Sequence, residues 1–244
     1  MSYNFQGKVA LVTGATKGIG KEIAIELSKS TAKVIAVARS KQLLDDLQKE
    51  HPSIKTVVLD ISDWDKTRQV LSTVGPIDLL VNNAGMGWLK PFLKMEEQDF
   101  DSVFGVNAKA LMNVTQIAIK DMMTRKVPGS IVNLSSQASL VGLLDHSVYC
   151  ASKGAVDSFT RAAALEFGPH KIRVNAVNPT VIMTDMGKLG WSDPKVSGPM
   201  LEKIPLRRFG EISEVVNTVL FLLSDQSSMI TGVTLPIDGG YTAA

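Results

Sequence analysis

The stretch Val9–Leu27, VALVTGATKGIGKEIAIEL, decides the fold predicted for this chain. It opens with a short apolar run, which predicts a buried strand. A turn with glycines at positions 14, 18 and 20 follows, and the apolar residues after it recur at helical spacing. This order lets the backbone approach a ligand closely and points helix amides at a phosphate. A plain glycine-rich turn is the alternative, but a place at the first strand-helix junction favours the phosphate-binding interpretation.

Further apolar runs of strand length alternate with segments of helical spacing along the rest of the chain. They are Val34–Val37, Thr56–Asp60, Leu79–Val81, Ser130–Ser136 and Ile172–Val177. Such alternation predicts an α/β fold with a doubly wound parallel sheet, Rossmann-like in its organisation. With 244 residues, 45% of them hydrophobic, the chain is long enough for one such domain. We therefore predict a single domain over residues 1–244.

Composition excludes several classes of function. The formal net charge of +2 gives no chain-wide field for nucleic acid or an anionic membrane. The single cysteine, Cys150, allows no intrachain disulfide, which indicates a reducing, cytoplasmic location. The polar N-terminus lacks the layout of a signal peptide, and polar residues interrupt the longest uncharged run, Val127–Leu144. We expect no membrane span, no nucleic-acid partner and no metal site.

Two cations lie where a nucleotide would meet the predicted loops. Arg39 follows the second strand, at the place where NAD-binding domains usually carry a carboxylate for the ribose hydroxyls. Lys17 lies within the glycine turn. A guanidinium forks onto a phosphate, so the missing acid and the two cations favour NADPH/NADP+ over NADH, although an arginine after a strand is ordinarily a solvated residue.

Tyr149 and Lys153 carry the predicted chemistry. Four residues apart on a helix, their side chains share one face. A cation beside a phenol stabilises the phenolate and lowers its pKa towards the working range, and Ser136 is predicted to hydrogen-bond the same reacting oxygen. Taken alone, the spacing also fits a half-buried tyrosine beside a solvated lysine. Asn107 is a mediocre helix former inside the predicted helical region Gln98–Lys126, and local rule-breaking of that kind often marks function.

Together these motifs resemble the short-chain dehydrogenase/reductase family, in the family's order from Lys8 to Tyr241. Asn-Asn-Ala-Gly at residues 82–85, after the fourth strand, is the most specific of them. The resemblance implies a catalytic tetrad of Asn107, Ser136, Tyr149 and Lys153, in which the asparagine kinks its helix and holds a water. It implies an acid against the adenine amino group at Asp60, for which a helix N-cap is the alternative, although Ser62 or Asp63 could cap better and both roles are compatible. The implied cofactor-binding residues are Gly14, Lys17, Gly18, Ile19, Gly20, Arg39, Ser40, Asp60, Asn83, Ala84, Gly85, Tyr149, Lys153 and Thr184.

A narrower resemblance concerns the substrate. Gly168–Thr180, Pro91–Leu93 and His146–Cys150 look like the subgroup of L-xylulose (dicarbonyl) reductases and tetrameric carbonyl reductases, from which Gly85–Gly87 and Ala38 depart. It implies NADPH-dependent reduction of a small dicarbonyl or of a ketose such as L-xylulose. The candidate substrate-binding residues are Ser136, Gln137, Leu143, His146, Tyr149 and Trp191, beside a partly helical lid around 183–210.

Alternatives remain open at this point. His146 would cap the helix at Tyr149 and Trp191 would pack within the lid, if neither contacted substrate. One alternative is a reductase for a different carbonyl compound, a steroid or a ketoacyl thioester. A catalytically silent nucleotide-binding scaffold on the same fold is a further alternative, although it would be expected to lose part of the tetrad.

The helix from Tyr149 to Phe167 carries apolar residues on more than one face. They are Ala151, Ala155, Val156, Phe159, Ala162, Ala163 and Leu165. One sheet contact needs fewer, and the family packs this helix against a twofold mate, so we expect a homotetramer. A helix buried entirely within one chain would have the same sequence pattern.

Overall fold

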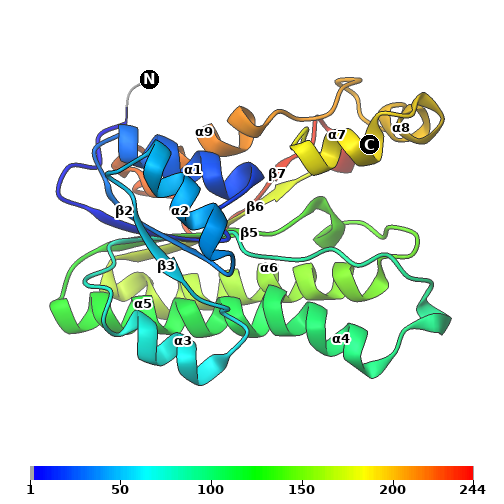
Figure 1. The fold of residues 1–244 in the computed structure, drawn as a ribbon. Coiled ribbons are helices and arrows are strands. Elements are labelled where there is room, and N and C mark those ends of the chain that lie inside the picture. The colour runs from blue at the N-terminus through cyan, green and yellow to red at the C-terminus, as the bar shows by residue number, and fades with distance from the viewer. Residues whose placement is uncertain (1–2, 244) are drawn as a thin grey trace.

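A seven-stranded parallel sheet organises the molecule (Figure 1). The computed structural model describes residues 3–243, apart from the Met186 side chain. The strands lie in the order β3-β2-β1-β4-β5-β6-β7, so the chain reverses direction across the sheet between β1 and β4. Their bounds are β1 Val9–Thr13, β2 Lys33–Ala38, β3 Lys55–Val58, β4 Leu79–Asn82, β5 Gly129–Leu134, β6 Ile172–Pro179 and β7 Thr234–Ile237. The predicted doubly wound sheet is confirmed.

Helices cover both faces of the sheet (Figure 1). One layer contains α1 (Gly18–Lys29), α2 (Lys41–Glu50) and α9 (Ile212–Leu223). The opposite layer contains α3 (Trp64–Leu71), α4 (Glu97–Phe104), α5 (Leu111–Arg125) and α6 (Ser147–Phe167). Two short helices, α7 (Asp185–Trp191) and α8 (Pro194–Leu201), follow β6, so the region around 183–210 is partly helical as predicted.

Alternate residues of each central strand enter two separate cores. In β1, Ala10 and Val12 pack with residues of α1 and α9, whereas Leu11 packs with residues of α5 on the other face. All three are fully buried. Successive side chains of a strand point to opposite faces, so a strand covered on both sides is apolar throughout.

A buried polar network fixes the pairing of β4 with β5. Asn82 and Asn133 are register partners, and Asn82 Nδ2 donates to Asn133 Oδ1 over 2.9 Å and to Thr115 Oγ1 over 2.8 Å. Asn133 Nδ2 in turn donates to Thr160 Oγ1 over 2.9 Å. The network joins the two strands to α5 and α6, which is how both helices are oriented over the sheet.

The predicted helical region Gln98–Lys126 is interrupted, as expected, around Asn107. A π-helical segment, Gly105–Ala110, separates α4 from α5. The Asn107 side chain explains the interruption because it exchanges two hydrogen bonds with the backbone of Met86, at 2.8 and 3.0 Å. Single-turn π segments of this kind are frequent at functional sites.

Several boundaries differ from the predicted ones. β5 ends at Leu134, two residues before the predicted end at Ser136, and β3 ends at Val58. α6 begins at Ser147, before Tyr149. Among residues 3–243, no helix combines the length and apolar character needed to cross a membrane.

Candidate active site

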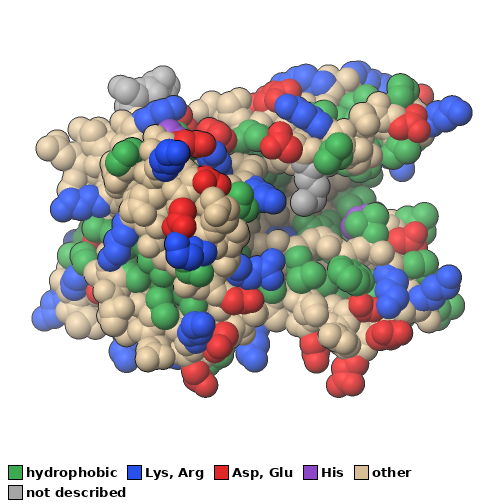
Figure 2. Space-filling model, in the orientation of Figure 1, with side chains coloured by type: hydrophobic (Ala, Val, Ile, Leu, Met, Phe, Trp, Pro, Cys, Tyr) green, Lys and Arg blue, Asp and Glu red, His purple; other side chains and the backbone are tan. Residues whose placement is uncertain are grey.

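The candidate catalytic side chains meet beyond the carboxyl ends of the central strands. Ser136 follows β5, and Tyr149 and Lys153 lie one turn apart on α6. Lys153 Nζ donates to the carbonyl oxygen of Leu134 over 2.8 Å and lies 5.8 Å from the centre of the Tyr149 ring. The space-filling view shows a hollow between the part of the molecule that carries α7 and α8 and the layer that contains α6 (Figure 2). Open parallel sheets bind their ligands at this edge.

The titration of Tyr149 departs from the sequence-based argument. Burial raises the pKa of its phenol, and a hydrogen bond with Ser136 opposes that rise without cancelling it. The expected lowering towards neutral pH is therefore wrong for the protein atoms alone. The reason is that desolvation disfavours the phenolate. Tyr149 is thus held in its protonated form, as a proton donor requires.

Lys153 shows the complementary effect. Burial lowers the pKa of its ammonium to about 8, and the negative charge of Asp157 opposes that shift. The side chain is buried, with its nitrogen bonded to a strand carbonyl. The charge that stabilises a developing phenolate is therefore present at neutral pH and lost in mildly alkaline solution.

Asn107 reaches the same site from the π segment. Its side chain is fully buried, and Nδ2 donates to Ser152 Oγ over 3.0 Å as well as to the Met86 carbonyl. Ser152 precedes Lys153 on α6. The structure thus brings Asn107 against the turn of helix that carries the lysine.

The glycine turn is packed against the end of β4 too tightly for side chains. A Cβ at Gly20 would lie 2.2 Å from Asn83 Nδ2 and 2.4 Å from the Gly14 carbonyl oxygen. Gly14 has a φ of +66°, and a Cβ there would lie 2.9 Å from Ala84 Cα. Asn83 Nδ2 donates to the carbonyls of Thr13 and Gly14, so its side chain supports the turn. The amide end of α1, which begins at Gly18 next to Ile19, receives no side-chain cap, and amides of this kind can bind an anion.

Two further cofactor candidates approach this turn from other elements. Thr184 caps α7 by accepting from Gly187 N over 3.0 Å, and a Cβ at Gly18 would lie 3.1 Å from its methyl carbon. Gly85 follows Ala84, which packs against Gly14, and a Cβ at Gly85 would lie 3.5 Å from Lys153 Nζ. The glycine turn, α7 and the active-site lysine therefore enclose one site.

Arg39 and Asp60 come together after β2 and β3. Arg39 NH1 lies 4.0 Å from Asp60 Oδ2, and both side chains are exposed. Partial burial alone would raise the pKa of Asp60, but hydrogen bonds from Ser62 and the charges of Arg39 and Lys66 hold it below its usual range. The cap of α3 is Asp63, so the N-cap alternative for Asp60 is wrong.

Ser40 and Lys17 begin helices. Ser40 Oγ accepts from Leu43 N over 3.4 Å and thereby caps α2. Lys17 precedes α1, makes no side-chain cap and is exposed. An exposed ammonium at the start of α1 adds positive charge where the helix amides point.

The substrate candidates divide into two groups. Gln137, next to Ser136, is 3% exposed, and its buried Oε1 is an acceptor with no partner among the described atoms. The rings of His146 and Tyr149 are in edge contact at 6.2 Å, with His146 Nδ1 2.6 Å from the Leu144 carbonyl. Since a carbonyl only accepts, Nδ1 carries a proton in that contact, and in the neutral ring Nε2 is then an acceptor. His146 makes no side-chain cap to α6.

Trp191 and Leu143 fit the apolar side of the site less directly. The Trp191 ring contacts Phe209 edge-on at 5.4 Å, which is the packing expected for a residue of the lid core. Leu143 is half-buried in the loop before α6.

Three residues that support the site, Thr13, Asp157 and Asn178, were not among the site residues predicted from the sequence. Thr13 Oγ1 accepts from the backbone amides of Asn83 and Ala84, each over 3.1 Å, and so ties β1 to β4 below the glycine turn. Asp157 and Asn178 form a buried pair behind Ser136. Asn178 lies in the stretch Gly168–Thr180 that resembles the reductase subgroup, which was the available signal, whereas nothing local marked Asp157.

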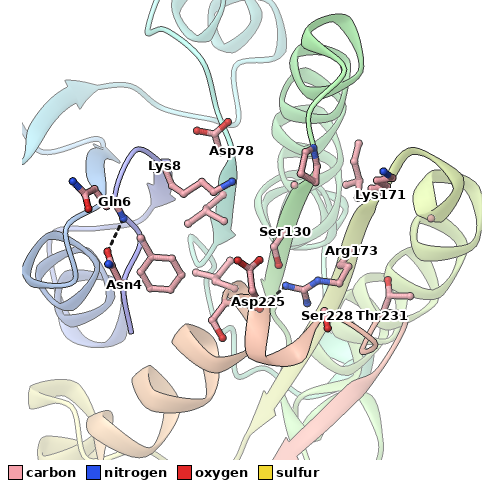
Figure 3. A pocket seen from close by; sticks show the side chains of 18 residues that line it. Asn4, Gln6, Lys8, Asp78, Ser130, Lys171, Arg173, Asp225, Ser228 and Thr231 are labelled. Atoms are coloured by element: carbon pink, nitrogen blue, oxygen red, sulfur yellow. Dashed lines mark hydrogen bonds between the residues drawn. The ribbon is translucent and has the colours of Figure 1, made fainter. Parts of the chain in front are cut away.

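A second pocket, of about 520 Å³, lies at the opposite ends of the strands (Figure 3). Two of its charged side chains, Arg173 and Asp78, are already bonded to the fold. The Arg173 guanidinium donates to the carbonyls of Leu222, Ser224 and Ile230 at the end of α9 and beyond it. Asp78 accepts from Arg125 and from a backbone amide. Within the described part of the chain, no three metal-ligating side chains gather here or elsewhere.

Comparison with known proteins agrees with this geometry. A family model described as enoyl-(acyl carrier protein) reductase matches residues 14–242. The L-xylulose reductase of Bos taurus is 53% identical over 243 residues, covering 100% of both chains. The chain belongs to the short-chain dehydrogenase/reductase family. Carbonyl reductase (NADPH) 2 of Sus scrofa is 46% identical and covers 100% of both chains.

Solved members of the short-chain dehydrogenase/reductase family share the whole fold. A gluconate 5-dehydrogenase from Burkholderia cenocepacia, in complex with NADP and tartrate, has a TM-score of 0.92 at 28% identity and covers 100% of this chain and 98% of its own. As a family member, the protein is an oxidoreductase that uses a nicotinamide nucleotide cofactor on a small molecule. The glycine turn, which leads into the N-terminal amides of α1 without a side-chain cap, fits such a cofactor.

Proposed function

We propose that the protein reduces a small carbonyl compound at the expense of NADPH, with Tyr149 as the proton donor. The observation that carries this proposal is the placement of Tyr149 between Ser136, which hydrogen-bonds it, and the Lys153 nitrogen, which lies 5.8 Å from the centre of its ring. When bound, the nicotinamide supplies the hydride that the carbonyl carbon receives.

Each residue of the tetrad has a separate task in this proposal. Ser136 hydrogen-bonds the carbonyl oxygen and orients it towards the Tyr149 hydroxyl. Tyr149 transfers its proton to that oxygen as the bond to carbon forms. Lys153 supplies the positive charge that stabilises the resulting phenolate, and Asn107 holds the helical turn before the lysine. The proposed cofactor residues are Lys17 and Ile19 at the start of α1, Ser40 at the start of α2, Ala84 and Gly85 after β4, and Thr184 at the start of α7.

The preference for NADPH rests on Arg39. Its exposed guanidinium lies beside Asp60, beyond β2, where a 2′-phosphate would add a charge-assisted hydrogen bond. The acid that would repel such a phosphate is missing at Ala38, the last residue of β2. The NADPH in the name of the Sus scrofa relative and the NADP in the Burkholderia structure support this preference.

The proposed substrate is a ketose such as L-xylulose, or a small dicarbonyl. The name of the Bos taurus relative supports it, and so do two acceptors beside the tetrad, Gln137 Oε1 and His146 Nε2. A site that bonds substrate hydroxyls discriminates against molecules that lack them, because its own polar groups are then left unpaired. We propose that the α7–α8 segment closes over the substrate as a lid and that Trp191 and Leu143 supply apolar contacts.

We propose a cytoplasmic homotetramer. Ala151 and Ala162 on α6 are exposed, and Leu165 is 84% exposed, so α6 presents apolar surface that the single chain leaves uncovered. Phe100 is also exposed, on α4, which contacts α6. Light scattering at low micromolar concentration should return four times the 26.3 kDa chain mass. Leu165→Glu should reduce that mass, and a wild-type monomer would refute the assembly.

The function is tested by following NADPH consumption with L-xylulose, D-erythrulose, diacetyl, a 3-ketosteroid, a ketoacyl thioester and an enoyl thioester. We expect turnover of the ketoses and of diacetyl. Preference for either thioester or for the steroid would replace the substrate proposed here, and consumption with none of them would support a silent scaffold.

The substrate contacts have a sharper test. Gln137→Ala and His146→Leu should each raise KM for the ketose by around tenfold, about 1.4 kcal/mol for one lost hydrogen bond. Diacetyl has no hydroxyl groups and serves as the matched control substrate. An equal rise in KM for both substrates would show that neither side chain hydrogen-bonds the substrate hydroxyl groups.

A further inference from the structure

A buried pair of polar side chains lies directly behind Ser136 and takes no part in the tetrad. Asn178, on β6, and Asp157, on α6, are 0% and 3% exposed, respectively. Asn178 Nδ2 donates to Asp157 Oδ2 over 2.9 Å. Asn178 Oδ1 and Asp157 Oδ1 have no partner among the described atoms. Burying a carboxylate and an amide that are incompletely bonded costs stability, so the pair needs a reason to be retained.

The pair has one allowed orientation. The Ser136 carbonyl oxygen only accepts hydrogen bonds, so the Asn178 atom that faces both it and Asp157 must be the amide nitrogen. That nitrogen carries a second hydrogen, which points to the turn after β5. There Asn178 Nδ2 lies 2.7 Å from Ser139 Oγ and 3.2 Å from the Ser136 carbonyl oxygen. Rotating the amide would place its oxygen against both Asp157 and the Ser136 carbonyl.

The turn held in this way is the one that presents Ser136. Its carbonyl also accepts from Ser139 N over 3.0 Å and from Ser139 Oγ over 2.7 Å. Ser136 Oγ accepts from Ala138 N over 3.2 Å within the same turn. Just before this turn, Ser135 N donates to the β6 carbonyl of Val177 over 2.9 Å. Asn178 adds the bonds from β6 to the turn itself, at Ser136 and Ser139, so the position of the Ser136 hydroxyl depends on that side chain.

We infer that Asp157 and Asn178 are positioning residues for the proposed reduction, with Asp157 fixing the Asn178 amide so that it holds the Ser136–Ser139 turn in its reactive geometry. The inference rests on the function proposed above. Asp157 has a second effect through space, because it lies one helical turn beyond Lys153 and its charge favours the lysine ammonium.

The first test compares kinetics at saturating NADPH. Asp157→Ala and Asn178→Ala should each lower kcat for the carbonyl substrate about tenfold or more, while NADPH affinity stays within about twofold. Asp157→Asn keeps an acceptor for the Asn178 amide and should retain more activity than Asp157→Ala. Thr160→Val is the matched control, since Thr160 is a buried polar residue of α6 that bonds Asn133 instead of the Ser136 turn. It should lose stability without a comparable loss of kcat.

An exchange of the two side chains separates positioning from packing. In the double variant Asp157→Asn, Asn178→Asp, the bond between the positions is restored, but the acceptor at 178 no longer donates to Ser136. We expect the melting temperature to recover relative to Asn178→Asp while kcat stays low. Recovery of both, or kcat losses no larger than that of Thr160→Val, would overturn the inference.

A crystal structure of Asp157→Ala provides the readout that needs no turnover. We expect a rotated Asn178 amide and a displaced Ser136 hydroxyl, and an unmoved turn would overturn the inference. A wild-type enzyme that reduces none of the tested carbonyls would instead refute the proposed function, whatever this structure shows.

Discussion

Lys153 Nζ and the carbonyl oxygen of Leu134 are joined by a hydrogen bond of 2.8 Å. Leu134 is the last residue of β5, and Ser136 follows it two positions later. The ammonium on α6 is thereby fixed relative to the strand that delivers the serine. The distance between the proton donor's helix and the group that orients the carbonyl is therefore set by one direct bond, together with the packing of α6 on the sheet.

Tyr149→Phe removes the transferable proton and little else. General acid catalysis contributes on the order of 10²–10⁴-fold, so we expect kcat to fall by at least 100-fold. NADPH binding, measured by fluorescence titration, should be largely unchanged. Retention of more than a tenth of the wild-type rate would mean that another group is the acid.

The rate of reduction should fall as the pH rises through about 8. Burial lowers the pKa of Lys153 to about 8, so its positive charge is present below that pH and lost above it. Burial raises the pKa of Tyr149 above the usual value for a tyrosine, so the phenol stays protonated throughout. A kcat/KM profile between about pH 6 and 10 measures this limb, and its absence below pH 9 would contradict the assignment.

The titration of Lys153 should lower the activity at high pH without lowering the stability of the fold. An unfolded lysine titrates near 10.5, so between about 8 and 10.5 the unfolded chain binds more protons at this position than the native one. Its contribution to the free energy of unfolding therefore rises with pH in that window. Thermal melts across the profile should show no destabilisation from Lys153.

Arg39→Ala should weaken NADPH binding and leave NADH binding little changed. A hydrogen bond to a charged partner contributes about 1.5–3 kcal/mol, which corresponds to roughly 10–150-fold in affinity. Ala38→Asp should repel a 2′-phosphate and favour NADH. Lys33→Ala, an exposed cation at the other end of β2, is the matched control. Equal affinity of the wild-type protein for NADPH and NADH would contradict this prediction.

Gly20→Ala should both destabilise the fold and weaken cofactor binding. Its methyl group would lie 2.2 Å from Asn83 Nδ2 and 2.4 Å from a backbone oxygen, so the glycine turn must shift. Overpacking of this kind costs about 1–3 kcal/mol. Gly168→Ala is the control, since a Cβ there meets nothing within 4 Å and the residue lines the pocket at the opposite ends of the strands. A thermal melt and an NADPH titration measure both effects.

The parts of the fold that depend on neighbouring residues were predictable. The glycine turn, the strand-helix alternation and the pairing of Tyr149 with Lys153 are short-range patterns, and each appears where expected. The rise in the Tyr149 pKa was not predictable, because the packing that buries the ring comes from distant segments. The approach of Thr184 to Gly18 and the bond between Asp157 and Asn178 likewise join residues whose proximity only the folded chain creates.

The asparagine pair between β4 and β5 selects one alignment of these two strands during folding. If either strand slipped by one residue, its asparagine would turn to the opposite face of the sheet. The bonds from Asn82 to Asn133 and Thr115 would then be lost in the apolar interior. A misaligned sheet is thus penalised before any ligand is present. Asn83 directly follows β4, and Ser136 lies two residues after the end of β5. We therefore expect correct pairing of these two strands to place both residues in the site as the chain folds.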